Sequence, residues 1–318
     1  MVDIDLNVKF KIMKTVFTPT VSFLALIGLG LFSACKKENA PMPQQPTETF
    51  ASVSQANVQQ VEMEATFNEV SRDASGIDAL TAGEDIGLYG NSGEGIFSGE
   101  SNNGLSGLTN QPSLTKCYTV TVTPRERGVF PKTVIIDFGT GCYVRGHKRS
   151  GKIITVYTGK LSIPGSLAKT TFENYRVDSF LIQGTHVFEN STKPGGNYRR
   201  FTRYVYKGKR TNENNGEWTA MESVQTDTQI EGNGSPEFPK DDAFSTEGKG
   251  EVQFSNGKYW TFLILEPLIK RNTCQWTEKG VLKAIINKDE STLDYGDGTC
   301  DNKAILTFNG QSKTIELR

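Results

Sequence analysis

The sequence predicts a mainly β protein: an antiparallel meander forms a curved sheet, a roll or a barrel-like domain, after an irregular N-terminal segment. From Cys117 onward, short segments rich in Val, Ile, Thr and aromatic residues alternate with turns. Asn256-Gly257 and Asn309-Gly310 are strong hairpin signals between such segments. No helical pattern separates the segments, and parallel strands need long crossover connections. These observations favour antiparallel pairing of successive strands.

The expected strands follow one another closely along the chain. We predict them at Cys117–Thr123, Thr133–Phe138, Ile153–Thr158, Thr170–Tyr175, Phe180–Phe188, Tyr198–Lys207, Glu217–Ile230, Glu247–Phe254, Tyr259–Leu265, Val281–Ile286, Ser291–Tyr295, Ala304–Phe308 and Lys313–Leu317. Trp260 lies in the apolar run WTFLIL, which predicts a core position for its indole.

The N-terminal residues predict export and a lipid anchor. Lys14 precedes the apolar run Val21–Phe32, and the small residues Ser33 and Ala34 come directly before Cys35. The apolar run is too short to cross about 30 Å of hydrocarbon as a permanent helix. We therefore expect a cleaved signal over residues 1–34, with translation starting at Met13 and Cys35 as the lipidated residue of the mature chain.

Three further segments follow this signal. Residues 35–55 are expected to form the lipid-anchored tether, because Lys36–Thr47 is polar and Pro-rich. Residues 56–113 are expected to hold a short helix at Ala56–Ser75, with poor caps, and then the Gly-rich irregular segment Gly83–Ser113. Residues 114–318 are expected to form the antiparallel β domain.

Four of the five cysteines belong to a duplicated unit, over about 117–159 and 274–310. Cys117 is followed by the segment DFGTGC, which ends at Cys142, and Cys274 by the segment DYGDGTC, which ends at Cys300. Each unit is expected to fold as a hairpin that brings its first cysteine opposite its second. In an exported protein this geometry favours the disulfides Cys117–Cys142 and Cys274–Cys300.

Composition and motifs argue against several classes of function. The formal net charge of −1 gives no electrostatic attraction to nucleic acid, so no nucleic-acid partner is expected. The chain has only two histidines, His147 and His186, each expected at an ordinary surface or turn position. No pattern indicates a nucleophile, a zinc site or a cofactor, so we predict that the protein is not an enzyme and holds no cofactor.

An acidic turn near the C-terminus allows two interpretations. Asp294, Asp297, Asp301 and Asn302 place four oxygen-bearing side chains within nine residues, which a calcium ion could use. Alternatively, Asp and Gly build a tight turn in which the Asp side chains accept hydrogen bonds from backbone N–H groups. We favour the turn and predict no metal site.

Two basic stretches, Arg145–Lys152 and Arg199–Arg210, are candidates for an anionic ligand or for solvated strand faces, and we favour the solvated faces. The second stretch mixes cations with tyrosines, a composition suited to anionic sugars or lipid head groups. The candidate ligand-binding residues are Arg199, Arg203, Tyr204, Tyr206, Trp218 and Trp276.

The segments LFSAC at Leu31–Cys35, IDFGTGC and DYGDGTCDN, with the strand Gly151–Gly159, resemble uncharacterised outer-membrane lipoproteins of Bacteroidota. That resemblance implies a lipid anchor in the outer membrane, on its periplasmic face or at the cell surface. We expect a non-catalytic β protein that binds a glycan, a lipid or a partner protein there. The alternatives are an envelope or polysaccharide hydrolase with a carboxylate pair such as Asp137 and Asp294, and a half-barrel lipid carrier.

Overall fold

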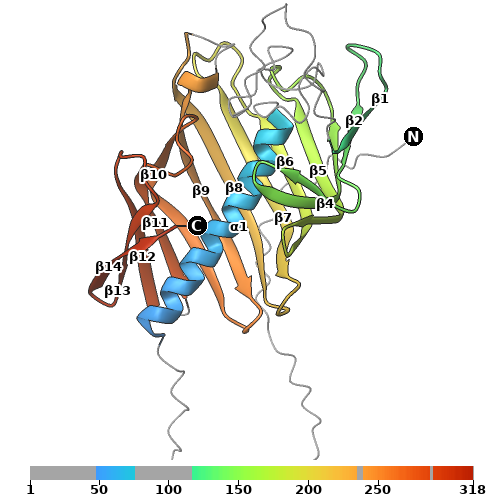
Figure 1. Cartoon of the computed structure of the whole chain (residues 1–318). Helices are drawn as coiled ribbons and strands as arrows, with labels where there is room; N and C mark the ends of the chain where they lie inside the picture. The colour runs from blue at the N-terminus through green and yellow to red at the C-terminus, as the bar shows by residue number, and fades with distance from the viewer. Residues whose placement is uncertain (1–47, 76–116, 235–238, 287–288, 318) are drawn as a thin grey trace, which may run out of the picture. The chain divides into compact units, whose positions relative to one another are not determined.

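The computed structural model describes residues 48–75, 117–234, 239–286 and 289–317. The predicted signal, Cys35, most of the tether and the Gly-rich segment lie outside these residues. The helix and all strands belong to one packed unit (Figure 1).

The described strands form one fourteen-stranded antiparallel sheet, which confirms the predicted fold class. Its strands are β1 (Thr119–Thr123), β2 (Lys132–Asp137), β3 (Cys142–Val144), β4 (His147–Tyr157), β5 (Leu167–Val177), β6 (Phe180–Asn190), β7 (Arg200–Asn212), β8 (Trp218–Glu231), β9 (Ala243–Phe254), β10 (Tyr259–Arg271), β11 (Lys279–Ile286), β12 (Asp289–Asp297), β13 (Lys303–Phe308) and β14 (Gln311–Glu316). Each of the thirteen predicted strands overlaps one of these, and only the three-residue β3 was not predicted.

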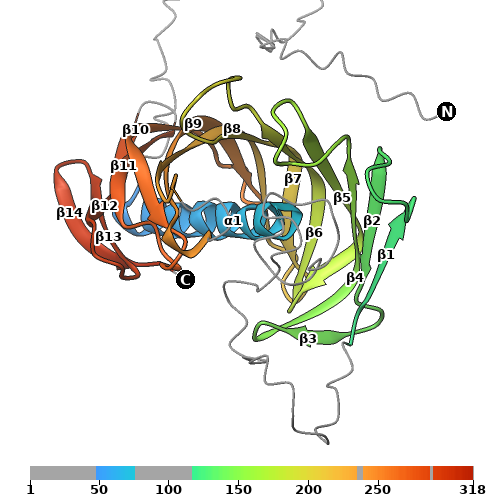
Figure 2. The same cartoon turned by 90° about the horizontal axis from the view of Figure 1, so that it is seen from above.

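The strands follow one another as a meander. Each pairs with its neighbour in sequence, except that β2 pairs with β4 and the short β3 pairs with the first part of β4. The sheet is not closed, and its order runs from β1 at one edge to β14 at the other. Figure 2 shows that the sheet curves around one long helix, α1 (Phe50–Ser75), which lies on its concave face.

The helix was predicted at Ala56–Ser75, but it begins at Phe50, inside the segment predicted as tether. Its start is set by a capping box. The backbone N–H of Ser52 donates to Thr49 Oγ1, and the backbone N–H of Thr49 donates to Ser52 Oγ, both at 3.2 Å. These two hydrogen bonds satisfy N–H groups that the first helical turn leaves unpaired.

The buried face of α1 repeats every three and four residues. This spacing keeps one stripe of a helix toward a core along its whole length, here about 39 Å. The apolar residues of the stripe are Val53, Ala56, Met63, Phe67, Val70 and Ala74. The stripe packs on β5, β6, β7, β8 and β13 and thus fills the hollow of the curved sheet.

Glycine allows the closest approach of helix and sheet. A Cβ atom on Gly208 of β7 would come within 2.9 Å of the Phe67 ring. The core around this contact includes Trp260, only 1% exposed, as predicted for its apolar run.

The two cysteine-containing units lie in the β1–β4 and β11–β13 regions of the sheet. The sulfur atoms of Cys117 and Cys142 lie 2.00 Å apart, and those of Cys274 and Cys300 lie 2.07 Å apart. Both predicted disulfide pairings are confirmed.

Candidate functional site

A cavity of about 140 Å³ lies between the C-terminal half of α1 and the concave face of β6–β10. Charged, amide, hydroxyl and aromatic side chains converge on it. The lining residues are Glu64, Asn68, Ser71, Arg72, Ser75, Phe188, Phe201, Arg203, Gln225, Asp227, Phe244, Thr246, Leu268, Lys270, Asn272 and Thr277.

Two simple periodicities place these side chains. On α1, lining residues recur at spacings of four, three and four from Glu64 to Ser75, which keeps them on one helix face. On the sheet, four neighbouring strands each contribute two residues that are two positions apart, so both point to the same face. These pairs are Phe201 and Arg203 on β7, Gln225 and Asp227 on β8, Phe244 and Thr246 on β9, and Leu268 and Lys270 on β10.

Arg203 is held firmly in one position on the cavity wall. Its Nε and Nη2 atoms donate to the two carboxylate oxygens of Asp227, at 2.6 and 2.9 Å. Nη1 donates to Asn68 Oδ1 on α1. Thr246 Oγ1 donates to Asp227 Oδ1 at 2.7 Å. Bidentate pairing of this kind fixes geometry as well as charge, and it joins α1, β7, β8 and β9.

Lys270 lines the same cavity wall as these groups. Its Nζ donates to the backbone carbonyl of Gln275 at 2.7 Å. Burial, together with the charges of Arg72 and Arg203, lowers the pKa of Lys270 to about 8. Glu278 and Asp227 act in the opposite direction but do not cancel this effect.

Glu64 is the second carboxylate of the cavity wall. Burial raises the pKa of the Glu64 carboxyl, although hydrogen bonds from Gln60 and Gln225 and the charge of Arg203 oppose the shift. Gln60 Nε2 donates to Glu64 Oε1 at 2.9 Å. The neutral form of the Glu64 carboxyl is therefore favoured more than that of an exposed glutamate.

Aromatic rings form an apolar side of the cavity. Phe188 and Phe201 are stacked with centroids 5.1 Å apart, and Phe201 and Phe244 meet at 6.1 Å with tilted planes. Phe244 lies directly across from Lys270 in the register of β9 and β10. One apolar surface and one cationic group thus stand side by side.

His186 was expected at a surface or turn position, but it is fully buried in the middle of β6. Its Nε2 lies 2.9 Å from Oγ of Ser71, which faces the cavity, and its ring stacks on Phe67. Burial, with the charge of Arg203 as a smaller cause, lowers the pKa of His186 to about 3. Within the described part of the chain, Nδ1 of His186 has no hydrogen-bond partner, so no carboxylate orients this imidazole.

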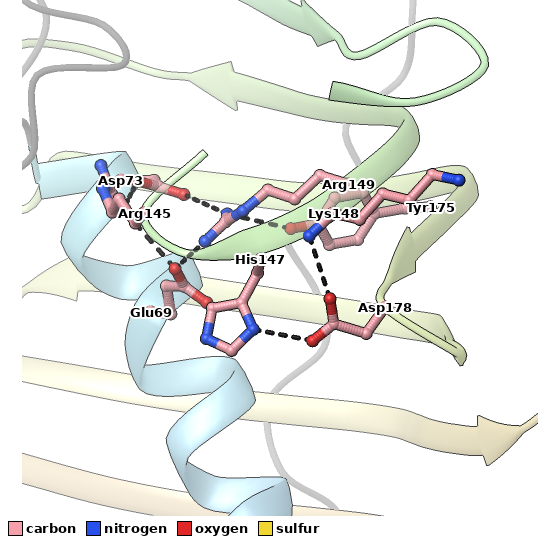
Figure 3. A network of polar contacts seen from close by, with 8 residues as sticks. All are labelled: Glu69, Asp73, Arg145, His147, Lys148, Arg149, Tyr175 and Asp178. Carbon is pink, nitrogen blue, oxygen red and sulfur yellow. Dashed lines mark hydrogen bonds and ion pairs between the residues drawn. The ribbon is translucent and has the colours of Figure 1, made fainter. Parts of the chain in front are cut away.

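Beyond the cavity, a polar network fixes the last turns of α1 to β4 and β5 (Figure 3). Arg149 of β4 is 0% exposed; it pairs with Glu69 and donates to the Tyr175 hydroxyl at 3.1 Å. Arg145 Nη1 lies 3.1 Å from Asp73 Oδ1. The first basic stretch was interpreted as a solvated strand face, which is wrong for Arg149, because this side chain points inward to the acids of α1.

The predicted ligand-binding residues do not form one site. Arg203 lines the cavity, whereas Tyr204 and Tyr206 follow it on the alternate, convex face and stack on each other at 5.9 Å. Trp218 lies under the ammonium of Lys209, with 4.6 Å between the nitrogen and the ring centre.

The other two candidates lie apart from the cavity lining. Arg199 precedes β7, where its carbonyl accepts from the backbone N–H of Gln229. Trp276 packs against the apolar core next to Cys274.

The aspartates of the duplicated unit accept hydrogen bonds from backbone N–H groups of their own turns. Asp137 Oδ1 accepts from the backbone N–H of Gly139 at 2.8 Å, and Asp294 Oδ1 accepts from that of Gly296 at 2.9 Å. Asp297 and Asp301 accept from the backbone two residues ahead in the same way. These bonds agree with the turn interpretation. Asp137 ends β2, and Asp294 lies in the second half of β12. These strands lie on either side of α1 in Figure 2, so the structure does not bring the hydrolase pair together.

A second hollow, of about 330 Å³, lies on the opposite face of the sheet over a register shift between β9 and β10. Its lining includes the exposed apolar side chains of Leu263 and Leu265. It gathers far fewer charged groups than the cavity beneath α1, which is therefore the better candidate for specific recognition.

Most residues of the cavity wall, including Glu64, Asp227 and Lys270, belong to no sequence motif. The signal for these residues is the alternation of the strands, because the two lining residues on each of β7, β8, β9 and β10 are two positions apart.

Among the described residues, no helix combines the length and apolar character needed to span a membrane. Comparison with protein-family models, curated proteins and solved structures found no match to this chain.

Proposed function

We propose that this protein is a lipid-anchored, non-catalytic binding protein of the outer membrane, and that it holds part of a glycan in the cavity between α1 and β6–β10. The observation that carries the proposal is the composition of this wall. Charged and amide side chains, held by α1 and four neighbouring strands, face a wall of phenylalanine rings. Sugars offer hydroxyl groups to such polar residues and C–H faces to such rings.

The hydrogen bonds of the cavity favour binding over hydrolysis. Glycoside hydrolysis needs two carboxyl groups that are available to the substrate. Both oxygens of Asp227 are already engaged, by Arg203 and by Thr246. Among the described residues, no carboxylate orients the histidine of the Ser71–His186 pair, and a pKa of about 3 makes this imidazole a poor base near neutral pH.

The position of α1 favours a small ligand over a lipid chain. A half-barrel carrier would need an open apolar concave face, but the side chains of α1 pack along this face. The remaining space of about 140 Å³ is close to that of a cavity that holds one benzene molecule, about 150 Å³. An acyl chain is several times longer than such a ring.

The anchor is tested by Cys35→Ser. The unlipidated protein should partition into the aqueous phase in a detergent split, because the thioether-linked lipid is the expected attachment. Wild-type protein, which should remain in the detergent phase, is the control. Membrane association that persists after the substitution would contradict the proposed anchor.

The binding site is tested with an array of bacterial and dietary oligosaccharides, probed with the full chain in detergent. Thr277→Trp should abolish retention, because an indole at this lining residue would fill the cavity. Thr261→Trp is the matched control, since Thr261 is exposed on β10 outside the cavity lining. Retention that survives Thr277→Trp, or equal loss in both variants, would argue against the cavity.

A further inference from the structure

We propose that the cavity recognises an acidic sugar, a single hexuronic acid unit whose carboxylate pairs with Lys270 and whose ring lies on Phe244 and Phe201. This inference rests on the proposed function and names the ligand class of the same site. It follows from the juxtaposition of a cationic end and an aromatic wall.

The register of the sheet makes the cationic and aromatic parts of the site direct neighbours. Phe244 and Lys270 are direct partners on β9 and β10. Directly opposite residues in an antiparallel pair have Cβ atoms about 4.5–5.5 Å apart. The two side chains therefore start from neighbouring points on the same face of the sheet. One bound unit can meet both groups when the ammonium and the ring turn toward the cavity that both residues line.

The balance of charge favours an anion. Asp227 neutralises Arg203 through two short hydrogen bonds, so this pair adds little net charge. Of the other charged groups of the lining, Lys270 is cationic, and Glu64 is pushed toward its neutral form by burial. Burial first, and then the charges of Arg72 and Arg203, lower the pKa of Lys270 to about 8, and a bound carboxylate would oppose both effects by pairing with the ammonium.

The groups that face Lys270 come from several elements. Arg72 on α1 and Arg203 on β7 disfavour its charged form, whereas Asp227 on β8 and Glu278, just before β11, favour it. A bound carboxylate would add one more negative charge to this set and raise the pKa of Lys270. Binding near pH 8 should therefore take up protons from the buffer.

Polar groups around the ring suit its hydroxyls. Gln225, Asn272 and Thr277 line the cavity and carry both donors and acceptors. The space of about 140 Å³ suits one ring rather than a disaccharide within the cavity. We therefore expect the terminal or a protruding uronic acid of a glycan to enter.

Calorimetric titration of the full chain in detergent tests the inference, with D-glucuronate, D-glucose, acetate and inorganic phosphate as separate ligands. At pH 7, D-glucuronate should bind at least about tenfold more tightly than either D-glucose or acetate, because only glucuronate meets both parts of the site. Lys270→Gln should weaken D-glucuronate by about tenfold to a hundredfold, as expected for the loss of a charged hydrogen bond. Lys249→Gln, at an exposed position of β9, should leave affinity unchanged.

The proton linkage gives a second readout on the wild-type protein, so the test does not depend on the variant folding. At pH 8, titration in two buffers of different ionisation enthalpy should report uptake of up to about half a proton per ligand, because Lys270 is half deprotonated at its pKa of about 8. Absence of proton uptake on binding would contradict a carboxylate at Lys270.

The remaining outcomes separate this inference from the proposed function. Equal binding of D-glucose and D-glucuronate would overturn the acidic-sugar inference and leave a glycan-binding cavity. Binding of phosphate or acetate as tightly as D-glucuronate would also overturn it and indicate a simple anion site. If none of these ligands binds but the array retains neutral oligosaccharides through the cavity, only the acidic-sugar inference fails. If the array retains nothing either, both fail.

Discussion

Replacing Arg149 by Met should destabilise the protein far more than the same change at an exposed arginine. Arg149 is 0% exposed and contacts Glu69, Asp73 and the Tyr175 hydroxyl, which fixes the end of α1 to the sheet. Methionine keeps much of the aliphatic volume but removes the charge, so Asp73, which is 4% exposed, would lose one of its cationic neighbours. Removing one partner of a buried ion pair costs about 3–5 kcal/mol.

Arg176→Met on β5 is the matched control. Arg176 pairs with Glu213 at 2.8 Å, but the two side chains are 34% and 40% exposed. Exposed pairs contribute about 0–1 kcal/mol. The contrast between the two arginines therefore isolates burial, because residue type, substitution and surrounding strands are similar.

Urea unfolding of the folded chain, followed by tryptophan fluorescence, measures both variants. With an m-value of roughly 3 kcal/mol/M, Arg149→Met should lower the midpoint by about 1 M or more, and Arg176→Met by about 0.3 M or less. Adding Asp73→Asn to Arg149→Met should recover part of the loss, because it removes the charge of a buried carboxylate that has lost the Arg149 guanidinium. Equal midpoints for the two single variants would refute the conclusion that this network holds α1.

Three further outcomes are expected. The pKa of His186 is about 3 in the folded chain and about 6.5 in the unfolded chain, so the unfolded chain binds the proton first as the pH falls. The contribution of His186 to the free energy of unfolding should therefore fall by about 1.4 kcal/mol per pH unit below pH 6.5. His186→Gln should remove this slope between pH 6.5 and 5 in urea titrations. Replacing Cys274 and Cys300 together by Ser should cost about 3.5 kcal/mol in the chain-entropy view, measured against wild type without reductant. Calcium or a chelator should leave the melting temperature of wild type and Asp297→Ala unchanged, because the acids of this turn bond to the backbone; a calcium shift lost in the variant would disprove this.

The strands were predictable because their signals are local. Alternation of apolar and polar residues and the two Asn-Gly turns need no knowledge of distant parts of the chain. The three residues of β3 are too few to show alternation, so this strand was missed. The disulfide pairing was predictable for a related reason, since each pair is closed by a hairpin of neighbouring strands.

The start and place of α1 were harder to predict. Its apolar spacing indicated a helix, but the capping box uses Ser52 where Glu or Gln is more usual, so the first turn was assigned to the tether. Nothing local indicates that this helix lies in the hollow of a sheet whose strands begin more than forty residues later. That position depends on long-range packing of the whole meander.

The second basic stretch shows why the candidate site was only partly predictable. Arg203 and Tyr204 were grouped because they are adjacent, but successive side chains of a strand point to opposite faces. Arg203 and Arg210 face α1, where they meet Asn68 and Glu62, while Tyr204 lies on the other face. Separating each strand into its two faces before looking for clusters would have divided the stretch correctly.

The contacts of α1 also affect the entropic cost of binding a ligand in the cavity. Glu62 pairs with Arg210 at 2.8 Å on one side of the lining residues of α1, and Glu69 pairs with Arg149 farther along. Between them, Asn68 accepts from Arg203, itself part of the cavity wall. Because these bonds hold the helix at several points along the cavity, ligand binding need not order the helix first. A preorganised site avoids this entropic cost, so the space present without ligand sets the size of ligand that fits.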